Sequence, residues 1–421
     1  MRKRKNCRES SAESESDRGR EMKYIVVLGD GMADEPMGEL GGKTPLAYAE
    51  TPVMDALAKR GEIGMVKTVP DGMSPGSDTA NLSVLGYDPE IYYSGRSPLE
   101  ALNIGVNMED GDVAIRANLV TLSEEESAYE DKRILDHSAD EISTEEAAVL
   151  LEAVKKELQN EMFQFYVGTS YRHCLIWKEG MVVSLTPPHD IRGKRITEYL
   201  TDEKLLLEMQ KRSYEILNHH PVNVERRKKG LNPGNSLWFW GAGTKPSLCP
   251  FEEKFHKKGA MISAVDLLKG IAVGTDMKNI AVEGANGGLH TNYEGKAEAG
   301  LKALLKDGCD FAYIHVEAPD EMGHQGSTEK KIQAVQYLDA RVIRLVKEGL
   351  DASGEDYRML VLPDHPTPIC VKTHTGNPVP YLLYDSRKTE KHDWKYSEEE
   401  AGKTGKYFAK GHELMEYFLE D

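Results

Sequence analysis

Three apolar runs in this chain end in an acidic residue, and this repeated pattern constrains the fold more than any other feature. The runs are KYIVVLGDG at 23–31, DFAYIHVEAPD at 310–320 and YRMLVLPDH at 357–365. A short uninterrupted apolar run is typical of a strand that is buried on both faces, as in a parallel sheet. We therefore expect an α/β fold with a mainly parallel sheet.

The segment between the second and third runs predicts a crossover helix. Within 327–350, apolar side chains recur at helical spacing, at Ile332, Val335, Leu338, Val342 and Leu345. In an open α/β sheet, ligands bind outside the carboxyl ends of the strands. We therefore expect Asp30, Asp320 and Asp364, which follow the three predicted strands, to face one crevice.

The middle of the chain has a different pattern, in which short strands alternate with amphipathic helices. This pattern predicts an α+β domain inserted into the α/β domain. Its flanks, YYSGRSP at 92–98 and LNPGNS at 231–236, contain the Gly, Pro and Ser residues typical of hinges. The predicted organisation is a disordered N-terminal extension over 1–21, an α/β domain from 22–91 and 233–421, and an insert over 92–232.

The charge of the chain excludes two classes of partner. There are 53 Lys and Arg against 70 Asp and Glu, and the resulting net charge of -17 repels nucleic acids and anionic membranes. No apolar run approaches the roughly 18 residues of a membrane helix, and the N-terminal 21 residues lack the apolar segment of a secretory signal. The 5 cysteines lack CxxC spacing, which fits a reducing compartment. We expect a cytoplasmic protein, and the sequence leaves its oligomeric state open.

Oxygen and nitrogen donors gather around the predicted strand ends. Asp320 and His324 are separated by one helical turn, so they would share a helix face. Each motif alone is an ordinary turn or helix-face pattern, but their convergence favours a metal site. The donors are Asp30, Ser77, Asp320, His324, Asp364, His365 and His374. Without sulfur, this set suits two divalent ions, Mn²⁺ or Zn²⁺, with Mg²⁺ as a further alternative.

Ser77 in SPGSDTANLSVLG has two interpretations. As an N-cap, its hydroxyl would accept a backbone N–H of the helix that follows, which is the ordinary use of serine at such a position. As a nucleophile, it would lie where the helix N-terminus and an adjacent cation both favour an anion. Both interpretations place Ser77 at the start of a helix.

Seven motifs, taken in order, resemble those of one family. They are VVLGDGMADEP, PGSDTANLSVLGYDP, SGRSPLEALNIGV, RANLVT, ISAVDLLKGIA, EAPDEMGHQG and LPDHPTP followed by KTHTGNPVP. From about Met22 to the C-terminus, the chain resembles the cofactor-independent phosphoglycerate mutases of the archaeal type, which belong to the alkaline phosphatase superfamily. The resemblance implies an alkaline-phosphatase-like three-layer α/β domain with a mainly parallel sheet, interrupted by an α+β domain that holds the substrate.

The resemblance also implies roles for the metal-site residues. Ser77 would carry the phosphoryl group while 3-phosphoglycerate and 2-phosphoglycerate interconvert, without 2,3-bisphosphoglycerate as a cofactor. One ion would be held by Asp30, Ser77, Asp364 and His365. The other would be held by Asp320, His324 and His374.

The insert would hold the carboxylate and hydroxyls of this small phosphorylated metabolite. Arginines suited to bind carboxylate or phosphate are Arg96, near the first hinge, and Arg116, Arg172 and Arg192. For each, a surface arginine in a modest ion pair is the alternative. Candidates for proton transfer or substrate contact are His137, His189 and Asp190, and solvated or capping histidines are the alternative.

One residue departs from the family pattern. Many members carry a lysine where this chain has Glu317, in HVEAPDE. A carboxylate there would repel a phosphoryl group unless it is paired or has another role. None of the proposed metal ligands is altered, but two alternatives stay open. One is a related metal-dependent phosphatase or phosphotransferase on another small metabolite, similar to homoserine kinases, and the other is a non-enzymatic acidic binding protein.

Overall fold

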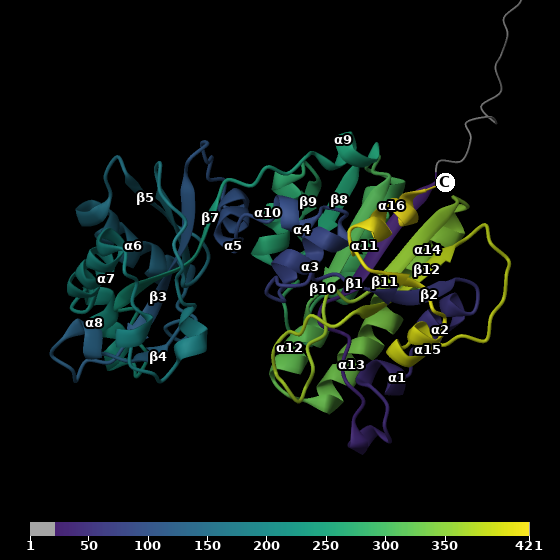
Figure 1. The fold of residues 1–421 in the computed structure, drawn as a ribbon, viewed down its shortest axis with the longest axis horizontal. Helices are drawn as coiled ribbons and strands as arrows, with labels where there is room; N and C mark the ends of the chain where they lie inside the picture. The colour runs from purple at the N-terminus through teal and green to yellow at the C-terminus, as the bar shows by residue number, and fades with distance from the viewer. Residues whose placement is uncertain (1–21, 421) are drawn as a thin grey trace, which may run out of the picture.

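The computed structural model describes residues 22–420, which form two lobes (Figure 1). The predicted extension over 1–21 lies outside the described residues. The larger lobe contains an eight-stranded sheet. Its strands, in spatial order, are β13 (Tyr407–Phe408), β2 (Glu62–Val66), β12 (Val379–Asp385), β11 (Tyr357–Leu362), β1 (Lys23–Gly29), β10 (Phe311–Val316), β8 (Gly259–Ile262) and β9 (Lys278–Ile280). Because β12 alone runs antiparallel to its neighbours, the sheet is mainly parallel, as predicted.

Helices cover both faces of this sheet because its strands are apolar on both sides. In β1, Ile25 and Val27 pack into one core cluster, and Val26 and Leu28 pack into another. The first cluster includes residues of α2 (Pro52–Ala58), α11 (Tyr293–Leu305), α13 (Thr328–Tyr337) and α14 (Arg344–Ser353). The second includes residues of α3 (Ser77–Val84), α9 (Phe251–Phe255), α10 (Asp266–Gly274) and α16 (Glu413–Leu419). This three-layer arrangement confirms the predicted fold class.

The predicted crossover helix over 327–350 is present but is not uniform. A π-helical segment, Leu338–Ile343, joins α13 to α14. Asp339 in this segment accepts the backbone N–H groups of Val53 and Met54 at 3.2 and 2.7 Å. The π-helical segment therefore contains Asp339, the residue that caps the N-terminus of α2. Shorter helices of this lobe are α1 (Pro45–Tyr48), α4 (Pro89–Tyr92), α12 (Ala318–His324) and α15 (Glu398–Lys403).

The smaller lobe is built on a five-stranded antiparallel sheet around β3. Its strands are β3 (Val113–Leu122), β4 (Ile134–Asp136), β5 (Phe163–Tyr166), β6 (Arg172–Trp177) and β7 (Ser236–Thr244), and its helices are α6 (Thr144–Leu158), α7 (Lys204–Leu217) and α8 (Pro221–Lys228). Since β7 pairs with β3 over residues 236–244, the boundary predicted at 232 falls before the last strand of this sheet.

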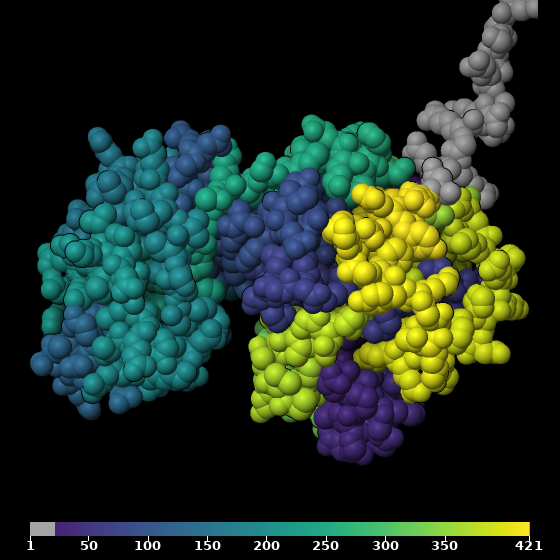
Figure 2. Space-filling model, viewed as in Figure 1, coloured from purple at the N-terminus to yellow at the C-terminus, as the bar shows by residue number. Residues whose placement is uncertain are grey.

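The two lobes are joined by α5 (Arg96–Asn103) and the end of β7 (Figure 1). The two crossing segments lie side by side, because Thr244 donates its backbone N–H to the Ser94 carbonyl at 3.1 Å. Helices α5 and α10 pack closely against each other. A Cβ at Gly270 of α10 would lie 1.8 Å from the Leu99 carbonyl oxygen of α5. Below this bridge a cleft separates the lobes (Figure 2). Among residues 22–420, every helix is too short or too polar to cross a membrane.

Candidate active site

The three strands at the centre of the large sheet bring the predicted donors to one edge. β11, β1 and β10 are adjacent. Asp30 directly follows β1, and Asp364 lies two residues after the end of β11. The helix α12, which follows β10, carries Asp320 and His324. Both α12 and α3 lie on the side of the large lobe that faces the insert (Figure 1). The fold therefore brings Asp30, Asp320 and Asp364 to the same edge of the sheet.

One group of donors surrounds Asp320. His324 Nε2 lies 3.2 Å from Asp320 Oδ2, and His374 Nε2 lies 3.4 Å from Asp320 Oδ1. The Nε2 atoms of the two histidines are 3.0 Å apart. Burial alone would raise the pKa of Asp320, but the contacts with His324 and His374 hold it well below its usual range. The carboxylate is therefore ionised and surrounded by nitrogen donors.

A second group contains Asp30 and Asp364, both buried. His365 Nε2 lies 3.5 Å from Asp30 Oδ1 and 3.5 Å from Asp364 Oδ2. The same imidazole stacks on the His374 ring with centroids 4.0 Å apart. His365 thus touches both groups, whereas the resemblance assigned it to the first ion alone.

Ser77 is the first residue of α3 and not its N-cap. The N-cap is Gly76, whose backbone is extended with φ -168° and ψ 157°, and Ser77 already lies within the helix. The capping interpretation is therefore wrong, because the helix begins one residue earlier than that interpretation requires. The Ser77 hydroxyl instead lies 3.1 Å from His365 Nε2, beside the donors and at a helix N-terminus that favours an anion.

These residues fit a pair of divalent cations on three grounds. Asp30 Oδ1 is buried and has no hydrogen-bond partner among the described residues. Burial raises the pKa of Asp30, and the neighbouring Asp364 and Asp320 carboxylates raise it further. The three acids therefore lie together without enough positive charge nearby to balance them. His324 Nδ1 lies 3.0 Å from the Lys372 carbonyl oxygen, which leaves Nε2 for a ligand, as in many metal sites.

Two residues of this site were missed by the sequence reasoning. His315, on β10, offers a ligand atom within 4.8 Å of those of Asp30 and Asp364. Asn81, one turn after Ser77, donates to the Ser77 carbonyl and to Asp364 Oδ2, both at 2.8 Å. The position of Asn81 in the TANLS motif was a usable signal, whereas His315 is hidden inside an apolar strand pattern.

On the insert, several predicted substrate residues lie together around Trp240. The Arg116 guanidinium lies 4.4 Å from the centre of the Trp240 ring, and His189 packs against the same ring at 5.3 Å. His137 contacts His189 with ring centroids 6.2 Å apart. The structure therefore places Arg116, His137 and His189 in one cluster around Trp240.

Glu100 connects two of the predicted arginines. Its carboxylate lies 2.9 Å from Arg96 Nε and 3.1 Å from Arg116 Nε. Arg172 joins the insert to the large lobe instead, with Nη2 3.6 Å from Asp266 of α10. The remaining two predicted residues are exposed.

Arg192 Nε donates to the Leu135 carbonyl at 3.3 Å, and Asp190 lies 3.7 Å from His189 Nε2. Neither of these two contacts joins Arg192 or Asp190 to a metal-site residue. Their predicted roles remain predictions.

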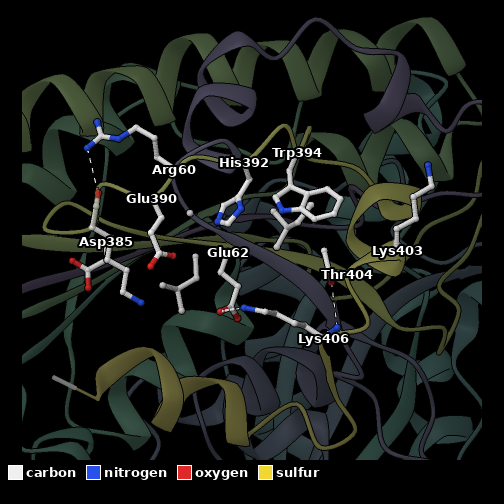
Figure 3. Close-up of a pocket in the computed structure, with 13 residues that line it drawn as sticks. Arg60, Glu62, Asp385, Glu390, His392, Trp394, Lys403, Thr404 and Lys406 are labelled. Atoms are coloured by element: carbon white, nitrogen blue, oxygen red, sulfur yellow. Dashed lines mark hydrogen bonds and ion pairs between the residues drawn. The ribbon is translucent and has the colours of Figure 1, made fainter.

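A large cavity elsewhere contains none of the predicted site residues. It has a volume of about 340 Å³ and lies where β2 begins and β12 ends, between Arg60, His392, Trp394 and Lys406 (Figure 3). Because β12 runs against the other strands, this cavity lies at the sheet edge opposite the metal-site residues. Two of its acids are already paired, Glu62 with Lys406 and Asp385 with Arg358. The site is therefore identified by convergence of donors and not by cavity size.

Comparison with known proteins agrees with this geometry. A family model described as 2,3-bisphosphoglycerate-independent phosphoglycerate mutase matches residues 58–223. A protein of that name from Methanosarcina barkeri is 50% identical over 389 residues, covering 91% of this chain and 96% of the relative. A solved structure from Pyrococcus horikoshii has 30% identity and a TM-score of 0.77, covering 95% of this chain and 98% of that one.

A solved cofactor-independent phosphoglycerate mutase from Thermoplasma acidophilum has 26% identity and a TM-score of 0.60, and the match covers 94% of this chain and 99% of that one. Because each of these matches to a whole relative covers more than nine-tenths of this chain, it extends over both lobes. The earlier resemblance is thereby confirmed. The chain belongs to the family of 2,3-bisphosphoglycerate-independent phosphoglycerate mutases.

Proposed function

We propose that this chain interconverts 3-phosphoglycerate and 2-phosphoglycerate, with Ser77 accepting and returning the phosphoryl group beside two divalent ions. The observation that carries the proposal is the Ser77 hydroxyl, which is free of a capping role and lies 3.1 Å from His365 Nε2. The names of relatives up to 50% identical support the same activity.

In this proposal the Ser77 Oγ–P bond forms as the bond from phosphorus to O3 of the substrate breaks. The serine hydroxyl loses its proton and the released glycerate hydroxyl gains one. After the glycerate turns within the site, the bond from its O2 to phosphorus forms as the Oγ–P bond breaks, the O2 hydroxyl loses its proton, and the Ser77 hydroxyl regains one. The N-terminus of α3 would stabilise the anionic phosphoryl group through its backbone N–H groups.

The ions would be held by the proposed ligands, Asp30, Ser77, Asp320, His324, Asp364, His365 and His374. The chemistry supplied by such ions is neutralisation of the phosphoryl oxygens and activation of the hydroxyl. Mn²⁺, Zn²⁺ and Mg²⁺ all accept oxygen and imidazole ligands to some degree. The chain's own residues fix where the ions and the hydroxyl meet.

The insert would bind the glycerate part of the substrate. Two of its predicted residues carry buried nitrogens that lack a hydrogen-bond partner within the described chain, namely Arg172 Nε and His137 Nδ1, whereas Arg116 Nε lies 3.1 Å from Glu100. Because buried polar groups are normally paired, these atoms suit an anionic, hydroxyl-bearing ligand.

The test is a metal-dependent assay of 3-phosphoglycerate conversion with two serine variants of one helix. Ser77→Ala should lose essentially all turnover. Ser83→Ala is the matched control, because Ser83 is also on α3, is fully buried, and its hydroxyl has no partner among the described residues. Release of inorganic phosphate in place of 2-phosphoglycerate would identify a phosphatase and would reject the mutase.

A further inference from the structure

A lysine is buried beside the proposed metal site, on an element that supplies none of the proposed ligands. Lys296 lies on α11 and is 0% exposed. Its Nζ lies 2.7 Å from Glu317 Oε2 and donates to the His315 carbonyl at 2.8 Å. A buried ammonium is costly unless it is paired and hydrogen-bonded, so Lys296 is tied to Glu317.

Glu317 connects this lysine to a buried imidazole. Its second oxygen, Oε1, lies 3.5 Å from His315 Nδ1 and accepts the Ala264 backbone N–H at 3.3 Å. Despite its burial, the attraction of Lys296 and the contact with His315 lower the pKa of Glu317 to about 2. The carboxylate is therefore charged and held on both of its oxygens.

His315 in turn contacts a proposed metal ligand. Its Nε2 lies 3.0 Å from Asp30 Oδ2, at ion-pair distance but without hydrogen-bond geometry. The other oxygen, Asp30 Oδ1, is the buried atom without a hydrogen-bond partner, and it faces His365 Nε2 at 3.5 Å. Contact with His315 therefore engages one oxygen of Asp30 and leaves the other directed at the donor cluster.

We infer that Lys296, Glu317 and His315 form a buried chain of charges that positions Asp30 for ion binding. In this chain, Glu317 does not face the phosphoryl group as an uncompensated charge, because Lys296 neutralises it from α11. The three are positioning residues that act through Asp30. This inference concerns metal binding, and it rests on the proposed function only where it takes the bound ions to serve phosphoryl transfer.

The test measures Mn²⁺ binding directly and without substrate. Purified full-length protein is titrated with Mn²⁺, and free Mn²⁺ is followed by its electron paramagnetic resonance signal. Glu317→Gln keeps the volume of the side chain but removes the charge that faces Lys296 and His315. Loss of an outer partner of a ligand typically weakens metal affinity about 10- to 100-fold, and we expect a loss of that size in the weaker-bound ion at least.

Lys296→Met is the second variant, and it should weaken Mn²⁺ binding in the same way. Its matched control is Arg358→Met, which breaks another buried ion pair of the large lobe. Arg358 Nε lies 2.9 Å from Asp385 Oδ2, at the end of β11 opposite the donors. The control should lose stability but keep wild-type Mn²⁺ affinity. If Lys296→Met does not fold, Glu317→Gln carries the test alone.

Activity gives an independent readout. If the chain positions Asp30, the activity that Glu317→Gln loses at low Mn²⁺ should recover in part at saturating Mn²⁺, whereas general damage to the fold would not be rescued. Wild-type Mn²⁺ affinity in Glu317→Gln would overturn the inference. A wild-type protein that binds Mn²⁺ but leaves 3-phosphoglycerate unchanged would instead refute the proposed function and leave the inference standing.

Discussion

Removing the ammonium of Lys331 should destabilise the large lobe more than any surface charge does. Lys331 lies on α13 and is 0% exposed. Its Nζ lies 2.7 Å from Asp34 Oδ2 and donates to the Ala33 and Thr367 carbonyls at 3.2 and 2.8 Å. One ammonium therefore joins the loop that follows Asp30 to the loop that follows His365.

Lys331→Met keeps the apolar stem and deletes all three contacts. Breaking a buried ion pair by removing one partner typically costs about 3 to 5 kcal/mol. Asp34 would retain backbone donors, with the N–H of Glu35 at 2.8 Å and that of Ile369 at 3.2 Å. We therefore expect a loss near the lower end of that range, about 3 kcal/mol.

Unfolding in urea is monitored by circular dichroism for Lys331→Met and for two comparison variants. Lys347→Met removes a partly exposed partner of Asp351 on α14 and should cost at most about 0.5 kcal/mol. The double variant Lys331→Met/Asp34→Asn leaves no unpaired buried charge, so it should be more stable than Lys331→Met alone. A loss below about 1 kcal/mol in Lys331→Met would refute the reasoning.

Three further predictions concern pH, metal and the bridge between the lobes. Burial raises the pKa of Asp339 from 3.8 to about 6, so the folded state binds this proton more tightly than the unfolded state does. The free energy of unfolding should therefore fall by up to about 3 kcal/mol as the pH rises through this window. Asp339→Asn should lack that slope in urea titrations repeated across pH. Removal of divalent ions with a chelator should abolish turnover and lower the melting temperature, and added Mn²⁺ should restore both; a metal-free protein with full activity would contradict the site. Gly270→Ala should destabilise the α5 contact, since its Cβ would lie 1.8 Å from the Leu99 carbonyl oxygen, and unchanged thermal unfolding would contradict this packing.

The donors at the strand ends could be predicted because the signal for them is local. A buried strand followed by an acid places that acid at the carboxyl edge of a parallel sheet, and Asp30 and Asp364 follow this rule. Ser77 could be placed at a helix start, but its role could not be decided from the sequence, because the capping and nucleophile interpretations both place it there. Gly76 as the N-cap decides against capping.

What could not be predicted depends on contacts between distant segments. Lys296 is part of an ordinary amphipathic helix in the sequence, and only the packing of α11 on β10 brings it to Glu317. His315 lies within an apolar run, so its polar partners are invisible before the fold is known. The apolar stretch at 236–244 suits either sheet, and only its pairing with β3 assigns β7 to the insert.

The central claim is that the phosphoryl group resides on Ser77 during the reaction. The most direct measurement is to mix the Mn²⁺-loaded protein with 3-phosphoglycerate labelled in the phosphoryl group, quench in acid, and locate the label by peptide mass spectrometry. The account predicts label on the peptide that contains Ser77, and none in Ser77→Ala. Label on another residue, or conversion to 2-phosphoglycerate by Ser77→Ala at the wild-type rate, would contradict it.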